Sequence, residues 1–140
     1  MTRTLLSGGL ATLLLTLSGC GSGRVSVSGK VTYDDGTPVE AGSVIGEATV
    51  NGKVVAVQGT IRADGSFSWG GDREGDGAVP GHYKVIVVPV SLSEYQQSQG
   101  MTAAVDGKYT RYDTSGLSFD VTPGPNELNI TVSRPKPKGR

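Results

Sequence analysis

Apolar and polar residues alternate along most of the chain after residue 24. Over 25–33, for example, Val25, Val27, Val31 and Tyr33 alternate with polar residues. This period of two predicts a half-buried β-strand, because successive side chains of a strand point to opposite faces of the sheet. The segments predicted to be short strands bounded by turns are 25–33, 43–50, 53–62, 66–69, 117–121 and 128–132.

One further segment, 82–90, is apolar on both of its faces. Val85 and Val87 belong to one face, and Ile86 and Val88 to the other. Burial on both faces predicts a central strand of a sheet. The strand should end at the proline that follows Val88, because proline has no N–H group to donate to the sheet.

Turn signals separate these segments. Asn51-Gly52 is the dipeptide most typical of a tight β-hairpin, in which both central residues adopt positive φ. Asp64-Gly65 predicts a second tight turn, and the glycine- and acid-rich stretch 70–81 predicts a loop. With about seven strands and no helix expected after residue 24, the pattern predicts an all-β fold, an antiparallel β-sandwich.

Composition and charge agree with this picture and exclude one class of partner. Glycine accounts for 22 of the 140 residues, which suits many turns. Residues 20–133 contain eight basic and thirteen acidic side chains, so this part of the chain offers no basic field for nucleic acid. A basic tail follows over 134–140, where two prolines prevent a further strand, and we predict that it is disordered.

The first twenty residues have a different pattern. Arg3 supplies a positive start, and the uncharged segment from Leu5 to Leu17 contains seven leucines. Only sixteen residues separate Arg3 from Cys20, whereas a membrane-spanning helix needs about 20 apolar residues. Residues 1–19 therefore predict a cleaved secretory signal.

The segment Leu17-Ser18-Gly19-Cys20 closely resembles the lipobox of bacterial lipoproteins. The resemblance implies that Cys20 carries a diacylglyceryl thioether, that the mature chain begins at Cys20, and that residues 20–24 tether a domain to the membrane. Gly21 resembles the sorting pattern for the outer membrane, which implies a lipid-anchored protein of the cell envelope, facing the periplasm or the cell surface. The alternative is a secreted protein with an unpaired cysteine.

Three stretches between 25 and 133 carry a second resemblance. "VSGKVTYDDGTPVEAGSV", "ADGSF" and "VPGHYKVIVV" resemble the carboxypeptidase-regulatory-like, or transthyretin-like, β-sandwich, which is also Ig-like in its architecture. The segment "KYTRYDTSGLSFDVTPGPNELNITV" is similar to the end of small bacterial lipoproteins built on this domain. Each motif is mainly a turn signature, so the resemblance implies a fold for residues 25–133 rather than an activity.

The chemistry-bearing residues favour a protein that is not an enzyme and needs no cofactor. His82 is the single histidine, and no Gly-x-Ser-x-Gly turn presents a nucleophile. Transthyretin-like hydrolases of urate breakdown use several histidines and a C-terminal Tyr-Arg-Gly-Ser motif that this chain lacks. Asp72, Glu74 and Asp76 resemble the start of a calcium loop, but Tyr83 stands where the bidentate glutamate belongs, so we predict no metal and keep these three acids as the alternative.

The least regular stretch is 91–115, and loops of this length are usually functional or mobile. We predict that Tyr95 and the glutamines near it are exposed binding residues, that Tyr112 packs on the domain, and that 91–107 can be removed at little cost in stability. The glutamines concerned are Gln96, Gln97 and Gln99.

The predicted role is a membrane-anchored, non-catalytic structural or binding module, held by the lipid on Cys20 and in contact with an envelope protein or a glycan. The alternative is a carbohydrate- or peptide-binding module that uses the 91–115 loop.

Overall fold

The computed structural model describes residues 23–100 and 104–137, so the predicted signal segment and Cys20 lie outside the described residues. Almost all of the regular structure is β, as predicted. The elements in chain order are β1 (Val27–Tyr33), β2 (Ser43–Val50), β3 (Lys53–Thr60), β4 (Ser66–Ser68), β5 (Gly81–Val88), α1 (Glu94–Ser98), the 3₁₀-helix η1 (Gly107–Thr110), β6 (Leu117–Val121), β7 (Asn126–Glu127) and β8 (Ile130–Val132). No helix in this described part is long and apolar enough to cross a membrane.

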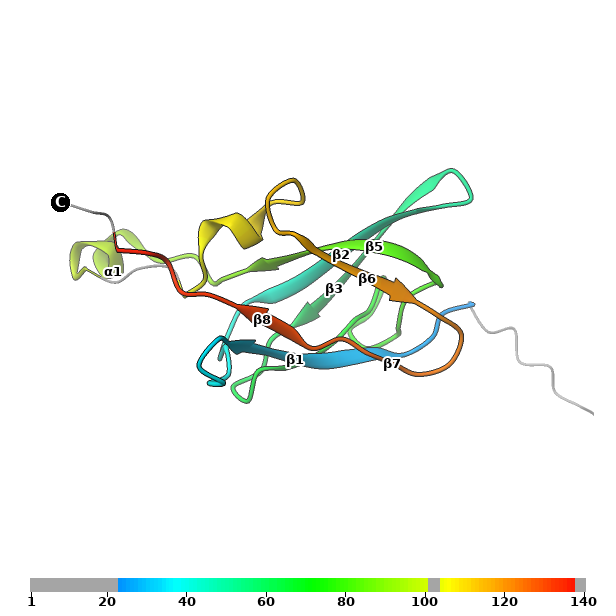
Figure 1. Cartoon of the computed structure of the whole chain (residues 1–140), viewed down its shortest axis with the longest axis horizontal. Helices are drawn as coiled ribbons and strands as arrows, with labels where there is room; N and C mark the ends of the chain where they lie inside the picture. Colours follow the sequence, from blue (N-terminus) through cyan, green and yellow to red (C-terminus); the bar gives the residue numbers. More distant parts are fainter. Residues whose placement is uncertain (1–22, 101–103, 138–140) are drawn as a thin grey trace, which may run out of the picture.

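The strands form two sheets with one apolar core between them (Figure 1). Each sheet has four strands. The larger sheet, which has the longer strands, has the order β3-β2-β5-β6. In the smaller sheet, β1 pairs with β4 on one side and with β7 and β8 on the other. The core takes residues from both sheets, such as Val31 of β1, Phe67 of β4 and Val85 of β5. The prediction of an all-β, two-sheet architecture is therefore confirmed.

The turn and centre predictions for the larger sheet are also confirmed. Asn51 and Gly52 have φ values of 51° and 76° and join β2 to β3 as a tight hairpin. β5 lies between β2 and β6 and ends at Val88, immediately before the proline. One face is buried along its length, with Val85 1% exposed, whereas the other face is buried only at Ile86, 8% exposed, and carries the exposed His82 and Lys84.

The expectation of a purely antiparallel sandwich is wrong for the smaller sheet. β7 and β8 run parallel to β1, because the chain leaves β6 on one sheet and returns along the other in the same direction as β1. The predicted strand 128–132 is also shorter than expected, because β8 begins only at Ile130: the Leu128 carbonyl lies over Gly29, and the side chain of Asn129 accepts a hydrogen bond from the Lys30 N–H at 3.2 Å. Alternation of side chains fixes neither strand direction nor such an interruption.

A tryptophan is at the centre of the core. Trp69 is fully buried, its ring contacts those of Phe67, Tyr83 and Phe119, and its indole N–H donates to the Val44 carbonyl at 3.2 Å. Aromatic side chains bury more apolar area than any others, and a buried indole N–H needs an acceptor. The ring therefore joins β4, β5, β6 and β2.

The domain has two distinct ends along its long axis (Figure 1). At one end, which we call the tether end, the chain enters the domain through residues 23–25. Gly81 pairs with Val121 at this end. The β2–β3 turn lies here too, because Gly81 is close to the Val50 side chain beside that turn. At the opposite, distal end, β1 finishes at Tyr33 next to Val132. α1 and the last described residues lie at this distal end.

Candidate functional site

A pocket of about 580 Å³ opens at the distal end, and we call it the distal pocket. Apolar side chains form much of its wall, and Arg134 and Glu40 add one charge of each sign. Val90 is 60% exposed, so an apolar group faces solvent here. Among the residues that line the pocket are Tyr33, Pro38, Val90, Leu92, Ala104 and Arg134.

Arg134 is fixed in this pocket by three groups. Its guanidinium carbon lies 3.8 Å from the centre of the Tyr33 ring, and its nitrogens donate to the Asp35 carboxylate at 2.9 Å and to the Thr37 hydroxyl at 3.0 Å. The hydroxyl and N–H of Thr37, together with Arg134, lower the pKa of Asp35 to about 2, so this ion pair persists at any physiological pH. The prediction that the disordered tail begins at residue 134 is therefore wrong for Arg134, which is bound to the domain.

Three of the predicted binding residues lie on α1, a short helix that the sequence analysis does not predict, and Gln99 is its C-cap. The Ser93 hydroxyl accepts from the N–H of Gln96, and the Gln96 side chain accepts in turn from the Ser93 N–H at 2.9 Å, which is a capping box. Tyr95 is 73% exposed, as expected. Gln97 and Gln99 are exposed too, whereas Gln96 is half-buried and serves the cap.

The segment after α1 packs on the domain more than its irregular sequence suggests. Val105 is completely buried, and the Asp106 N–H donates to the Ser133 carbonyl at 3.0 Å. Tyr109 packs against the core, and Tyr112 is half-buried, where burial and the nearby Glu47 charge raise the pKa of its hydroxyl. The expectation that 91–107 can be removed at little cost is wrong, because that deletion takes Val105 out of the core.

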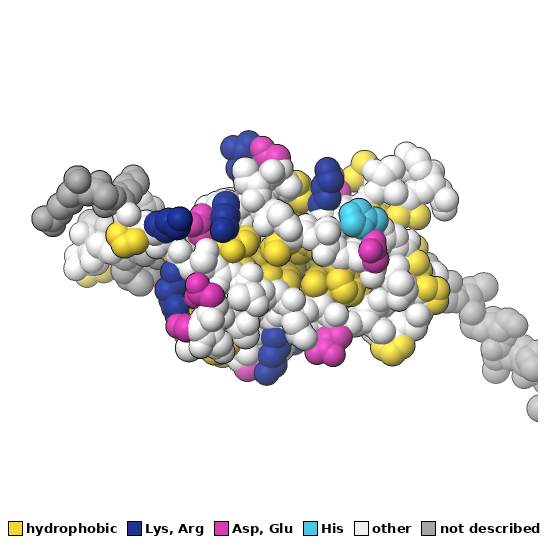
Figure 2. All heavy atoms as spheres, in the orientation of Figure 1, with side chains coloured by type: hydrophobic (Ala, Val, Ile, Leu, Met, Phe, Trp, Pro, Cys, Tyr) yellow, Lys and Arg dark blue, Asp and Glu magenta, His cyan; other side chains and the backbone are white. Residues whose placement is uncertain are grey.

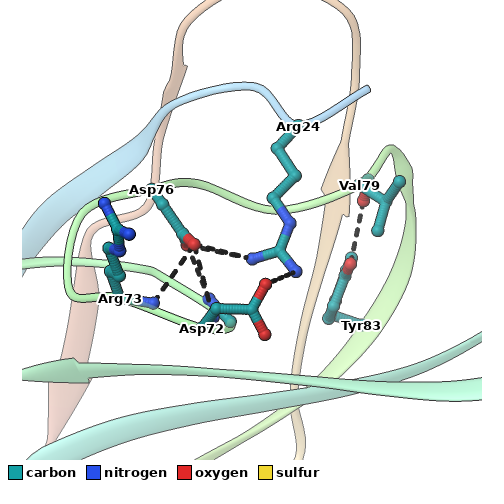
Figure 3. Close-up of polar contacts among 7 residues, drawn as sticks. Arg24, Asp72, Arg73, Asp76, Val79 and Tyr83 are labelled. Atoms are coloured by element: carbon teal, nitrogen blue, oxygen red, sulfur yellow. Dashed lines mark hydrogen bonds and ion pairs between the residues drawn. The ribbon is translucent and has the colours of Figure 1, made fainter. Parts of the chain in front are cut away.

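In the acidic loop 70–81, two of the carboxylates are paired with an arginine from the segment before β1 (Figure 3). Arg24 contacts Asp76 at 3.0 Å and Asp72 at 3.1 Å, and we call these three residues the Arg24 clamp. Burial acts against a charged Asp76, yet the N–H groups of Gly71 and Arg73 and the Arg24 guanidinium hold the pKa of this carboxyl below its usual range.

The candidate calcium ligands Asp72, Glu74 and Asp76 are therefore not arranged around a cation. Within 23–100 and 104–137, no three His, Cys, Asp or Glu side chains lie close enough together to hold a metal ion. The Arg24 clamp also means that residue 24, predicted to belong to the tether, is fixed to the domain. The Val25–Ala78 bridge, with N–H···O distances of 2.8 and 2.9 Å, continues this attachment.

His82 has a partner that the sequence does not reveal. Its Nδ1 lies 2.5 Å from the carboxylate of Asp120, directly across the β5–β6 pairing. The two side chains are 63% and 73% exposed on a sheet surface, so the pair has no enclosed site around it (Figure 2). The pairing of His82 with Asp120 depends on the register between β5 and β6. The alternation of apolar and polar residues predicts only which face of a strand each side chain is on.

A groove of about 850 Å³, lined mostly by polar residues, crosses the smaller sheet on its outer face. The groove follows the outward-facing residues of β1, Ser28, Lys30 and Thr32. Their alternation with apolar residues is the sequence feature that indicates a polar outer face here. A different feature, a band of apolar side chains, is visible between the two sheets along β6 and β8 (Figure 2). Leu117 and Phe119 of β6 are half-buried and pack against the core.

The fold and these surfaces define a two-sheet β-domain with a small pocket at one end and a fixed point of chain entry at the other. No protein-family model, curated protein or solved structure matches the chain.

Proposed function

We propose that this protein is a lipid-anchored, non-catalytic module of the bacterial cell envelope that holds a partner at its distal end. The observation that carries the proposal is that the chain enters the domain at one end of β1 and the distal pocket opens at the other. Arg24 precedes this strand at the tether end, and Tyr33 ends it in the wall of the pocket. A lipid on Cys20 would then present the pocket away from the membrane.

The chemistry of the distal pocket favours a protein segment as the partner. Val90 and Leu92 offer an apolar wall for an apolar side chain, while Glu40 and Arg134 supply charges at its border. Tyrosine and arginine are the residue types that most often dominate the energy of such contacts, and here Arg134 is held in place on Tyr33 before any partner arrives.

A carbohydrate is the second candidate partner, and Tyr95 is the observation that favours it. Its ring is 73% exposed on α1, with the exposed side chains of Gln97 in the same helix and of Gln99 at its C-cap. An exposed aromatic face beside amides suits a sugar ring, which presents both apolar C–H groups and hydroxyls.

The anchor is tested by Cys20→Ala. We expect the native protein to sediment with membranes and to have an intact mass that corresponds to a chain beginning at an acylated Cys20. The variant should lose acylation and processing completely, because the thioether forms on this sulfur. A native protein that proves soluble and unacylated would contradict the anchor.

The distal pocket is tested by Val90→Asp, with Val54→Asp as its matched control. Both valines are exposed, at 60% and 67%, but Val54 follows the β2–β3 turn at the tether end. After cross-linking in a detergent extract of envelopes, Val90→Asp should lose the partner recovered by the native protein, and Val54→Asp should keep it. Equal recovery by both variants would mean that the pocket is not the contact surface.

A further inference from the structure

The tether end carries exposed apolar side chains of its own. Val54, 67% exposed, follows the β2–β3 turn, and Pro123 and Pro125 are exposed in the turn after β6. Val25 and Val50 are half-buried beside them. The other two large apolar side chains that are strongly exposed among the described residues, Val90 and Tyr95, lie at the distal end. The exposed apolar groups are thus divided between the two ends.

The chain between the anchor and the domain is short. The Arg24 clamp and the bridge from Val25 to Ala78 fix the chain from residue 24 onward. Four residue steps separate Cys20 from Arg24, and an extended chain spans at most about 3.6 Å per step, or about 14 Å. An eight-residue strand such as β2 is about 26 Å long. The tether is therefore shorter than the sheet that it holds.

We propose that the tether end rests on the surface of the lipid bilayer, with Val54 and the turn around Pro123 in the interfacial region. This inference depends on the lipid anchor proposed at Cys20. The short tether brings this end to the bilayer, and its apolar side chains gain by leaving water there. The ammonium group of Lys53, next to Val54, suits the phosphate region of the headgroups.

The neighbouring charges indicate that apolar contact, not charge attraction, holds this end to lipid. The loop that follows β4 presents Asp72, which is 86% exposed, and Glu74. Arg24 and Arg73 offset two of the three carboxylates of this region, Asp72, Glu74 and Asp76, and the remaining negative charge opposes the attraction of Lys53 for an anionic surface. Contact should therefore change little with salt, since only charge interactions between exposed groups are screened.

A fluorescent label at position 54 tests the inference. Acylation blocks the Cys20 sulfur, so Val54→Cys in the lipidated protein offers a single free thiol for an environment-sensitive dye. In vesicles of phosphatidylethanolamine and phosphatidylglycerol, we expect this label to shift to the blue and to be quenched several-fold more by spin-labelled lipid than a label on Val90→Cys. The difference should persist when the salt concentration is raised.

Two other results are possible, and each would contradict a different proposal. If intact mass shows the anchor in place and the labels at 54 and 90 are quenched equally, or neither is quenched, the domain does not rest on its tether end and the anchor proposal survives. If Cys20 is unacylated in the native protein, both the anchor and the inference fail, and the dye will also label Cys20. Both valines are exposed, so neither cysteine variant disturbs the core.

Discussion

Replacing Gly29 with alanine is expected to lower the free energy of unfolding by about 3 kcal/mol or more. A Cβ atom at this position would lie only 1.7 Å from the carbonyl oxygen of Leu128. That oxygen belongs to the backbone between β7 and β8, so it can move only if the pairing of both strands with β1 is disturbed. Urea denaturation followed by Trp69 fluorescence measures the change.

Gly107→Ala is the matched control for this substitution. Gly107 begins η1, has no positive φ, and has no atom within 4 Å of an added Cβ. Alanine there should leave stability unchanged or raise it by a few tenths of a kcal/mol, because it reduces the freedom of the unfolded chain. If Gly29→Ala is as stable as Gly107→Ala, the close approach of Leu128 to β1 is wrong.

Trp69→Ala should lower the free energy of unfolding by about 3–5 kcal/mol. The substitution leaves a cavity where three aromatic rings meet the indole, and it leaves the Val44 carbonyl without its side-chain donor. Thermal unfolding followed by far-UV circular dichroism measures the loss. Tyr95→Ala removes an exposed aromatic side chain and should change stability by no more than about 0.5 kcal/mol. Similar melting temperatures for the two variants would show that Trp69 is not the centre of the core.

The sequence allowed the strands of the larger sheet to be predicted closely, for local reasons. β2 begins and ends at the predicted residues, because the Asn51-Gly52 turn fixes where the chain reverses. β5 could be placed at the centre because the apolar residues of its second half, around Ile86, indicate cover on both faces there. These predictions depend on side-chain period and turn chemistry, and both are properties of neighbouring residues.

The features that the sequence did not reveal depend on residues far apart in the chain. Arg24 and Asp76 are separated by 52 positions, and neither residue type indicates the other as its partner. The parallel course of β8 beside β1 follows from the path that the chain takes between the sheets. Val105 lies in an irregular stretch with no periodic pattern, so its burial could not be read from alternation.

Of the candidate site residues, Tyr95 could be predicted as exposed, whereas Arg134 could not be predicted as part of a pocket. A tyrosine among glutamines has few apolar neighbours with which to pack. Arg134 belongs to a run of basic residues and prolines that is typical of a disordered tail. Its stacking on Tyr33 and its pairing with Asp35 are tertiary contacts across about a hundred positions.

The parallel pairing of β1 with β8 determines how the domain would respond to a pulling force between the proposed membrane anchor and a partner. A pull at Arg24 and a pull at Tyr33 act on the two ends of one strand, so the covalent backbone bears the load. A pull at Arg134 instead acts on the end of β8, which lies beside the end of β1. Because the two strands run in the same direction, their hydrogen bonds are loaded in shear and together, not peeled apart one by one. If the proposed anchor and partner hold the domain at these two ends, we expect the β1–β8 pairing to resist force along the line that joins them.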